Sequence, residues 1–200
     1  MSATTEAAAP FAFTAENLAL AKKHIAKYPE GRQASAVLPL LDLAQRQNDN
    51  YLSQEAIRHV ASMLDMPFIR VWEVATFYTM FNLVPVGKHF LQLCRTTPCW
   101  LRGSDALEKV IRDKLGIRSG ETTADGQFSL LEVECLGGCV NAPVVQINDD
   151  YYEDLTPESF EAVLDALARG EKPPHGPQVK RLNSAPEGDR TTLLEEAGEG

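Results

Sequence analysis

The chain has 200 residues, of which 44% are hydrophobic and 24% are charged, and its net charge at pH 7 is −9. This length allows one or two domains with a core, and the composition is ordinary for a globular protein. Residues 86–169 hold fourteen acidic and eight basic side chains. Because nucleic acids select basic surfaces, no nucleic-acid partner is expected. No apolar run approaches the roughly 18–20 residues of a membrane-spanning helix, so no membrane insertion is expected.

Residues 14–85 have the apolar spacing of helices and predict a small all-α bundle. Thr14 and Ser53 are placed to cap the first and third helices, the second starts at about Gln33, and Pro67 precedes the fourth. The fourth helix carries an aromatic stripe, which we interpret as core because aromatic residues dominate core burial. This stripe consists of Trp72, Phe77, Tyr78 and Phe81.

In residues 86–170 the pattern changes to strands alternating with helices, in the order β-α-β-β-β-α. This order predicts an α/β domain with one crossover and a later hairpin. The elements are strands at Lys88–Cys94, Phe128–Cys135 and Pro143–Ile147, a fourth strand after a turn at Asp149-Asp150, and helices at Ser104–Leu115 and from Thr156 to Gly170.

The two ends of the chain differ in composition from these two regions. Residues 1–13 are expected to be a flexible N-terminus. Residues 171–200 are rich in proline and glycine and hold few large apolar side chains, which predicts an extended C-terminal tail, disordered alone and ordered by a partner. The expected domains are therefore 1–13, 14–85, 86–170 and 171–200.

The chain has only four cysteines, and they form two pairs. Cys94 and Cys99 make a C-x4-C pair, and Cys135 and Cys139 make a C-x3-C pair; each pair lies at the end of a predicted strand. Four thiolates can hold zinc, a [4Fe–4S] cluster or a [2Fe–2S] cluster. Two separated pairs favour [2Fe–2S], because each iron takes two protein ligands, but zinc and disulfides stay open as alternatives. The N-terminus lacks the features of a signal peptide, which weakens the disulfide alternative.

The residues between the cysteines suit a cluster. Thr96 and Thr97 carry hydroxyls that could donate to sulfur, and Arg95 is a nearby cation. Gly137 and Gly138 let the backbone come close to inorganic sulfide and adopt positive φ angles.

The pattern Cys94-x4-Cys99, then Cys135-Leu-Gly-Gly-Cys139 and Val140-Asn-Ala-Pro143, resembles the thioredoxin-like [2Fe–2S] ferredoxins. The helical half is similar to that of the small iron–sulfur (E) subunits of respiratory NADH:quinone oxidoreductase, complex I, and the segment Val71–Tyr78 carries this resemblance. The resemblance implies a thioredoxin-like domain in residues 86–170 and all four cysteines as cluster ligands. Cys94 and Cys99 would bind one iron, and Cys135 and Cys139 the other.

The same resemblance implies an electron-transfer subunit that exchanges single electrons with the FMN of a partner NADH-binding subunit. Other peripheral-arm subunits of complex I would be further partners. The sequence has no Gly-rich dinucleotide loop, so NADH and FMN are expected on the partner, and this chain alone should not be a competent enzyme.

Two alternatives stay open. One is the equivalent subunit of an NAD-linked hydrogenase or formate dehydrogenase, and the other is a zinc-stabilised interaction module. The expected location is peripheral, on the cytoplasmic face of a bacterial inner membrane. A mitochondrial matrix location is less favoured, because the N-terminus lacks arginine and carries Glu6.

Overall fold

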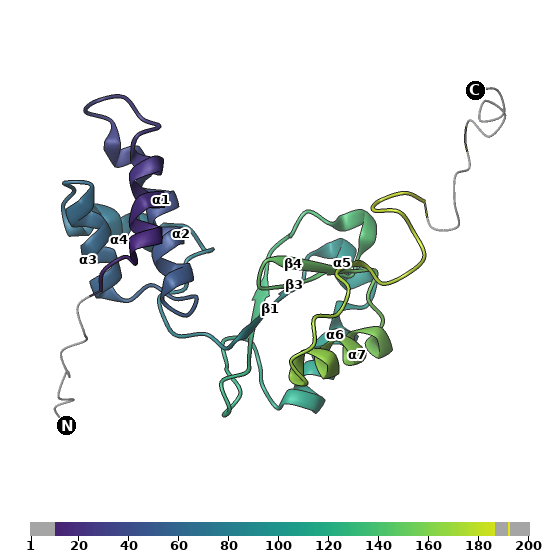
Figure 1. Cartoon of the computed structure of the whole chain (residues 1–200). Helices are drawn as coiled ribbons and strands as arrows, with labels where there is room; N and C mark the ends of the chain where they lie inside the picture. The colour runs from purple at the N-terminus through teal and green to yellow at the C-terminus, as the bar shows by residue number, and fades with distance from the viewer. Residues whose placement is uncertain (1–10, 187–191, 193–200) are drawn as a thin grey trace. The chain divides into compact units, whose positions relative to one another are not determined.

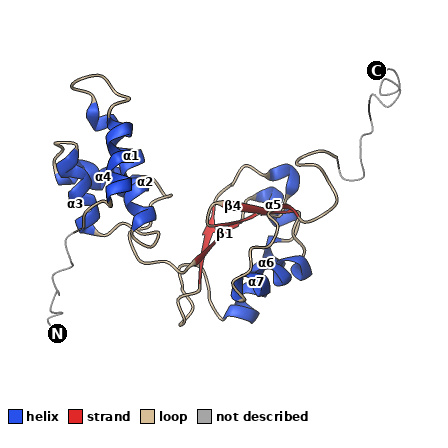
Figure 2. Ribbon diagram, viewed as in Figure 1, coloured by secondary structure: helices blue, strands red, loops and turns tan. Residues whose placement is uncertain are grey.

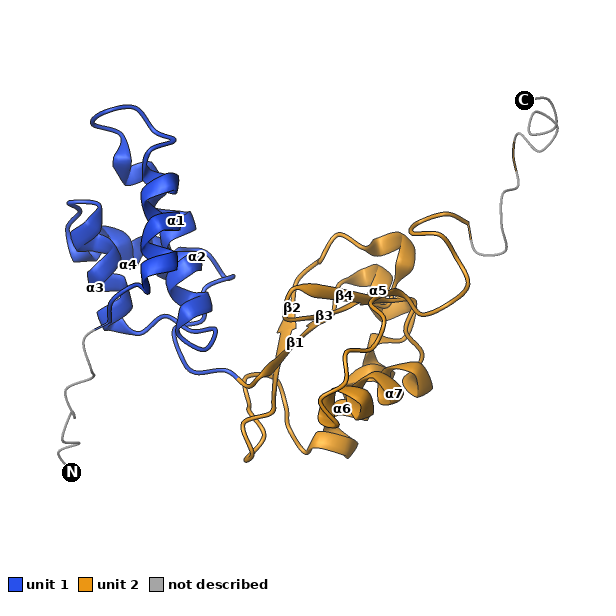
Figure 3. Cartoon of the chain, viewed as in Figure 1, with its two compact units in different colours: residues 1–86 blue, residues 87–200 orange. Residues whose placement is uncertain are grey.

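The computed structural model describes residues 11–186 and residue 192. The chain divides into two compact units, residues 1–86 and residues 87–200, which are described separately (Figure 3). The first unit is helical, and the second combines a sheet with helices (Figure 2). In the described part of the chain, no helix is long and apolar enough to cross a bilayer.

Within residues 11–86, the first unit contains the four helices that the sequence predicts (Figure 1). The Thr14 hydroxyl accepts a hydrogen bond from the Asn17 amide (3.2 Å), and the Ser53 hydroxyl accepts one from the Ala56 amide (3.2 Å). These bonds satisfy amides that have no partner within the helix, so both predicted caps are confirmed. The helices are α1 (Ala15–Ile25), α2 (Val37–Gln47), α3 (Gln54–Met63) and α4 (Phe68–Phe77), with a 3-10 turn, η1 (Gln33–Ala36), before α2.

The core of this unit begins before residue 14. Phe13 is buried and Phe11 packs against the same cluster, and both rings meet the His59 ring edge-on at centroid distances of 5.2 and 5.6 Å. The last residues of the expected flexible N-terminus are therefore held by aromatic packing. Residues 1–10 of that expected segment lie outside the described residues.

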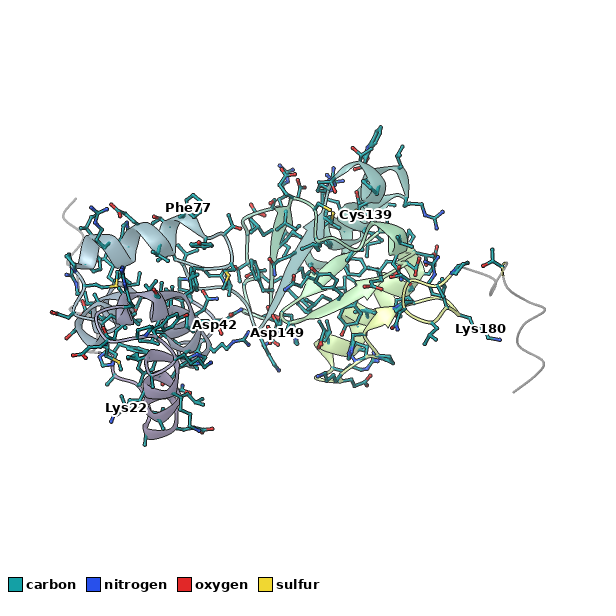
Figure 4. The ribbon with its side chains drawn as sticks, turned by 90° about the horizontal axis from the view of Figure 1, so that it is seen from above. Lys22, Asp42, Phe77, Cys139, Asp149 and Lys180 are labelled. Atoms are coloured by element: carbon teal, nitrogen blue, oxygen red, sulfur yellow. The ribbon has the colours of Figure 1, made fainter. Side chains whose placement is uncertain are left out.

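The aromatic stripe of the fourth helix is only partly core. Phe81 is buried and Trp72 is half-buried, but Phe77 is 77% exposed and Tyr78 is 40% exposed. The core interpretation is wrong for these two residues, because α4 ends at Phe77 and Tyr78 adopts an extended conformation. The helical spacing on which the prediction rested therefore stops there. Figure 4 labels Phe77 at this end of α4.

In its described residues, the second unit is built on a five-stranded mixed sheet in the order β2-β1-β3-β4-β5. The two parallel neighbours β1 and β2 are joined through a helical crossover, and β3 and β4 form an antiparallel hairpin. This confirms the predicted α/β fold preceded by helices. The strands are β1 (His89–Cys94), β2 (Phe128–Val133), β3 (Val145–Ile147), β4 (Asp150–Glu153) and β5 (Gly176–Pro177).

Helices α6 (Ser104–Leu115) and α7 (Pro157–Ala168) pack on one face of this sheet (Figure 1). The helix α7 begins with a reciprocal cap in which the Thr156 and Ser159 side chains each bond the other's backbone amide. Successive residues of a strand point to opposite faces. Leu93 therefore enters the core beneath the helices, whereas Cys94 belongs to a small separate cluster with Val144.

Candidate metal centre

Both cysteine pairs lie where chain segments leave the sheet. Cys94 is the last residue of β1, and Cys99 lies in the short helix α5 (Thr97–Leu101), which was not among the predicted elements. Cys135 follows β2, and Cys139 opens the 3-10 turn η2 (Cys139–Asn141). Cys94 and Cys99 are 2% and 1% exposed, whereas Cys135 and Cys139 are exposed, and all four are free thiols.

The structure brings the four cysteines into one region as two pairs. The Sγ atoms of Cys135 and Cys139 are 3.4 Å apart, and Cys94 and Cys99 lie in one buried cluster with Ala142 and Val144. The two pairs also interact electrostatically. Negative charge on Cys94 acts to raise the pKa of Cys135, and negative charge on Cys139 acts to raise the pKa of Cys99. Among the described residues, no three His, Cys, Asp or Glu side chains are gathered tightly enough to surround one metal ion. The site thus consists of two neighbouring pairs.

One backbone amide and one hydroxyl lie within hydrogen-bonding distance of the sulfurs. The Gly137 amide donates to Cys135 Sγ (3.3 Å), and the Thr96 hydroxyl lies 3.3 Å from Cys94 Sγ. The Leu136 backbone of the second loop helps to lower the pKa of Cys94 in the first. Such donors stabilise negative charge on sulfur and tune what a thiolate-bound centre does.

Within each pair the two thiols have opposite pKa shifts. Burial is the main cause that raises the pKa of Cys99 to about 12, and a hydrogen bond to Cys94 acts in the same direction. Burial opposes ionisation of Cys94 too, but hydrogen bonds led by that of Thr96 outweigh it, so its pKa is lowered.

The second pair follows the same pattern. The pKa of Cys135 is lowered, chiefly by the hydrogen bond from the Gly137 amide and next by a hydrogen bond to Cys139. The pKa of Cys139 is raised, mainly by its hydrogen bond to Cys135. Two sulfurs that share a proton behave in this way, and a bound metal would displace that proton, since metal binding requires thiolates.

The two glycines of the second loop are required for different reasons. Gly137 has φ = +83°, a left-handed conformation that side chains other than glycine rarely adopt. Gly138 has an ordinary φ, but a Cβ atom there would lie 3.0 Å from Cγ2 of Val144. Glycine at both positions therefore lets the loop curve tightly beside the sulfurs without strain or overpacking.

The structure adds site residues that the sequence alone does not reveal. The Tyr151 hydroxyl donates to the Leu136 carbonyl (2.7 Å) and so fixes the second loop from β4. Arg95 was expected as a cation near the sulfurs, but its guanidinium pairs with Asp105 (2.7 Å) and Glu108 (3.1 Å) on α6. Spacing along the chain predicts neither the contact of Tyr151 with Leu136 nor the ion pairs of Arg95 with α6, because each joins different elements of the fold.

The structure thus presents four thiols, as two pairs, at one end of the sheet of an α/β domain. The residues fit an iron–sulfur cluster, because the donor set is four thiols in two pairs and the Gly137 amide already donates to one of the sulfurs.

The model of the thioredoxin-like [2Fe-2S] ferredoxin family matches residues 21–168, and the chain belongs to this family. The predicted [2Fe–2S] cofactor is thereby confirmed, and zinc and disulfides are no longer needed to explain the cysteines.

Named relatives cover most of the chain. The E subunit of the NADH-quinone oxidoreductase of Rickettsia bellii is 64% identical over 157 residues, which span 78% of this chain and 94% of the relative. The mitochondrial NADH dehydrogenase [ubiquinone] flavoprotein 2 of Dictyostelium discoideum is 50% identical over 186 residues, spanning 93% of this chain and 75% of the relative.

One solved structure agrees in fold. A chain of an NAD+-reducing [NiFe]-hydrogenase in the air-oxidized state matches 65% of this chain and 23% of its own length, with a TM-score of 0.58 and 21% identity. At this identity the match shows a common fold only.

Proposed function

We propose that this chain is the electron-transferring E subunit of an NADH:quinone oxidoreductase. Its relatives at 60–64% identity carry that name, and their alignments cover 88–94% of their own lengths. When bound, a [2Fe–2S] cluster accepts and donates one electron at a time. The protein's own part is to hold the sulfurs, supply hydrogen bonds to them and keep one side of the site accessible.

The ligands in this proposal are Cys94, Cys99, Cys135 and Cys139. The observation that carries it is that two loops, from the ends of two parallel strands, each bring two thiols to one place, with the second pair 3.4 Å apart. Cys94 and Cys99 would bind one iron and Cys135 and Cys139 the other, because thiols within a pair are mutual neighbours.

The partner proposed to face this site is the subunit that binds FMN and NADH. Apolar side chains beside the cysteines support this proposal: Trp100 and Leu101 on α5 and Val140 after Cys139 are 55%, 70% and 68% exposed. Exposed apolar side chains grouped around a functional site are typical of a protein interface. Other peripheral-arm subunits would contact the helical unit and the C-terminal tail.

The location proposed for the assembled protein is peripheral, at the cytoplasmic face of a bacterial inner membrane. The subunit of an NAD-linked hydrogenase or formate dehydrogenase is the related alternative. The 21% identity to the hydrogenase chain, against 64% to the R. bellii subunit, favours the respiratory enzyme.

The test is anaerobic purification of the full chain, followed by iron and zinc counts, visible absorption and an EPR spectrum after dithionite reduction. We expect two irons per chain, a red-brown colour and a one-electron S = 1/2 signal, with no NADH oxidation by the isolated chain. Replacing any one of the four cysteines by alanine should abolish the signal. A colourless protein with one zinc would contradict the proposal, as would turnover of NADH by the chain alone.

A further inference from the structure

We propose that residues 172–183, here called the tail strap, position the second cysteine loop for cluster binding, with Arg181 as the positioning residue. This inference rests on the proposed function, because it takes the four cysteines to be cluster ligands. The sequence predicts only an extended tail for this segment.

The first half of the tail strap is fixed to the edge of the sheet. Gly176 and Pro177 form β5, which pairs with Tyr152 and Glu153 of β4, and the Gln178 amide donates to the Glu153 carbonyl (2.9 Å). The strap therefore leaves the sheet at a defined point. The strand β4 also carries Tyr151, whose hydroxyl holds the Leu136 carbonyl. The strap and the second cysteine loop are therefore attached to the same strand.

The second half reaches the residues that follow Cys139. The Arg181 side chain is 6% exposed, and its Nε lies 3.3 Å from a carboxylate oxygen of Asp154, whose side chain is 3% exposed. Nη1 of the same guanidinium donates to the Val140 carbonyl (3.3 Å) and lies 3.5 Å from Asn141 Oδ1. One buried guanidinium thus joins the turn before α7 to the second cysteine loop. Figure 4 labels Lys180 in the strap and Cys139 in the loop.

Asn141 completes this connection from the side of the loop. It is 1% exposed, and its Nδ2 donates both to the Asn183 carbonyl of the strap (2.9 Å) and to the Glu153 carboxylate (3.0 Å). Its carbonyl accepts from the Asp154 amide (2.7 Å). Buried polar groups that lose such partners are costly, so removing the strap's contacts releases the loop.

These contacts bear on the cluster because the second pair has little burial of its own. Cys135 and Cys139 are exposed, and two of the three residues between them are glycines, which add no side chains to pack. The direction of the Cys139 sulfur therefore depends on how Val140 and Asn141 are held. Arg181 touches neither cysteine in the described contacts and acts through these two residues.

Arg181→Lys separates positioning from charge. A lysine keeps a positive charge opposite Asp154, but its single ammonium cannot reproduce the forked contacts to Asp154 and the loop. Arg181→Met removes both the charge and the fork. Arg169→Met is the matched control, because Arg169 pairs with Glu171 at the surface, where the two side chains are 59% and 56% exposed.

The experiment follows cluster loss from the anaerobically purified full chain, by visible absorbance in excess iron chelator, together with the EPR g-values and the melting temperature. Replacing outer partners of metal ligands typically costs about 10–100-fold in metal affinity, so we expect Arg181→Met to lose its cluster about 10–100-fold faster with shifted g-values. Arg181→Lys should lower the melting temperature less than Arg181→Met yet still lose its cluster faster than the unaltered chain, and Arg169→Met should change neither.

The outcomes separate this inference from the proposed function. If the unaltered chain holds no cluster, the proposed function fails. If it holds a cluster and both Arg181 variants lose it at the rate of Arg169→Met with unchanged g-values, the tail strap does not position the loop. Should Arg181→Met fail to fold, the rate and g-values of Arg181→Lys decide alone.

Discussion

Replacing the two loop glycines by alanine should damage the second cysteine loop in different ways that can be told apart. Gly137→Ala forces a Cβ into a left-handed conformation with φ = +83°, which costs about 1–2 kcal/mol whatever its neighbours are. Gly138→Ala has no such conformational cost, but its Cβ would lie 3.0 Å from Val144 Cγ2. Overpacking of that kind typically costs about 1–3 kcal/mol.

The difference predicts a rescue. Val144 is 1% exposed, so Val144→Ala destabilises the chain by itself, but it also removes the Cγ2 atom that Gly138→Ala would meet. We expect the pair Gly138→Ala and Val144→Ala to be about 0.5–3 kcal/mol more stable than the sum of the single changes. The pair Gly137→Ala and Val144→Ala should be additive, because a Cβ on Gly137 meets no atom within 4 Å.

The assay is urea unfolding of the three single variants, the two double variants and the unaltered chain under reducing, metal-free conditions, followed by circular dichroism. The cluster content of the same variants, purified anaerobically, shows whether the loop's function follows its stability. Additive free energies for both double variants would refute the steric account of Gly138, and a rescue of Gly137→Ala by Val144→Ala would refute the conformational account of Gly137.

Three further changes have defined outcomes. Tyr151→Phe removes the hydrogen bond to the Leu136 carbonyl. It should cost about 1 kcal/mol in urea unfolding and shift the EPR g-values, and unchanged g-values would contradict the role given to Tyr151. The pKa of His89 is lowered, mainly by burial and next by the charge of Lys88, so the folded chain favours its neutral form. The free energy of unfolding should therefore fall as the pH drops below about 6.5 towards that lowered pKa. His89→Gln should remove part of this fall, as measured by urea unfolding at several pH values. Phe160→Ala empties a site that is 0% exposed beneath the sheet and should lower the unfolding free energy by about 3–5 kcal/mol, and a loss below about 1 kcal/mol would contradict the packing described.

Much of the fold can be predicted because its signals are local. Thr14, Ser53 and Thr156 each precede an apolar helical repeat, and each caps a helix in the structure. The cysteine spacing is likewise a local signal, so all four candidate ligands stand out from the sequence alone. Where a helix ends is a weaker signal, and Phe77 and Tyr78 were therefore assigned to the core although α4 ends at that point.

The features that the sequence does not reveal depend on contacts between distant segments. Arg181 meets Val140 and Asn141 across about forty residues of sequence, and no periodicity or motif links these positions. The strand β5 has two residues, too few for an alternating pattern, and it includes a proline, which is usually confined to edge strands. Such a segment has the composition of a tail and becomes part of the sheet only because β4 offers it an edge.

The two cysteine pairs have different roles in the site. Cys94 and Cys99 are buried against Val144 and fixed by the end of β1 and by α5, so they form the rigid side. Cys135 and Cys139 are exposed, and their loop is held from outside by Tyr151 and the tail strap. Because an accessible sulfur shortens the path for an electron to a partner, the exposed pair is the side at which we propose that the partner docks. The same exposure leaves that pair without packing of its own, so adjustments of the cluster's properties should concentrate in the residues that hold the second loop.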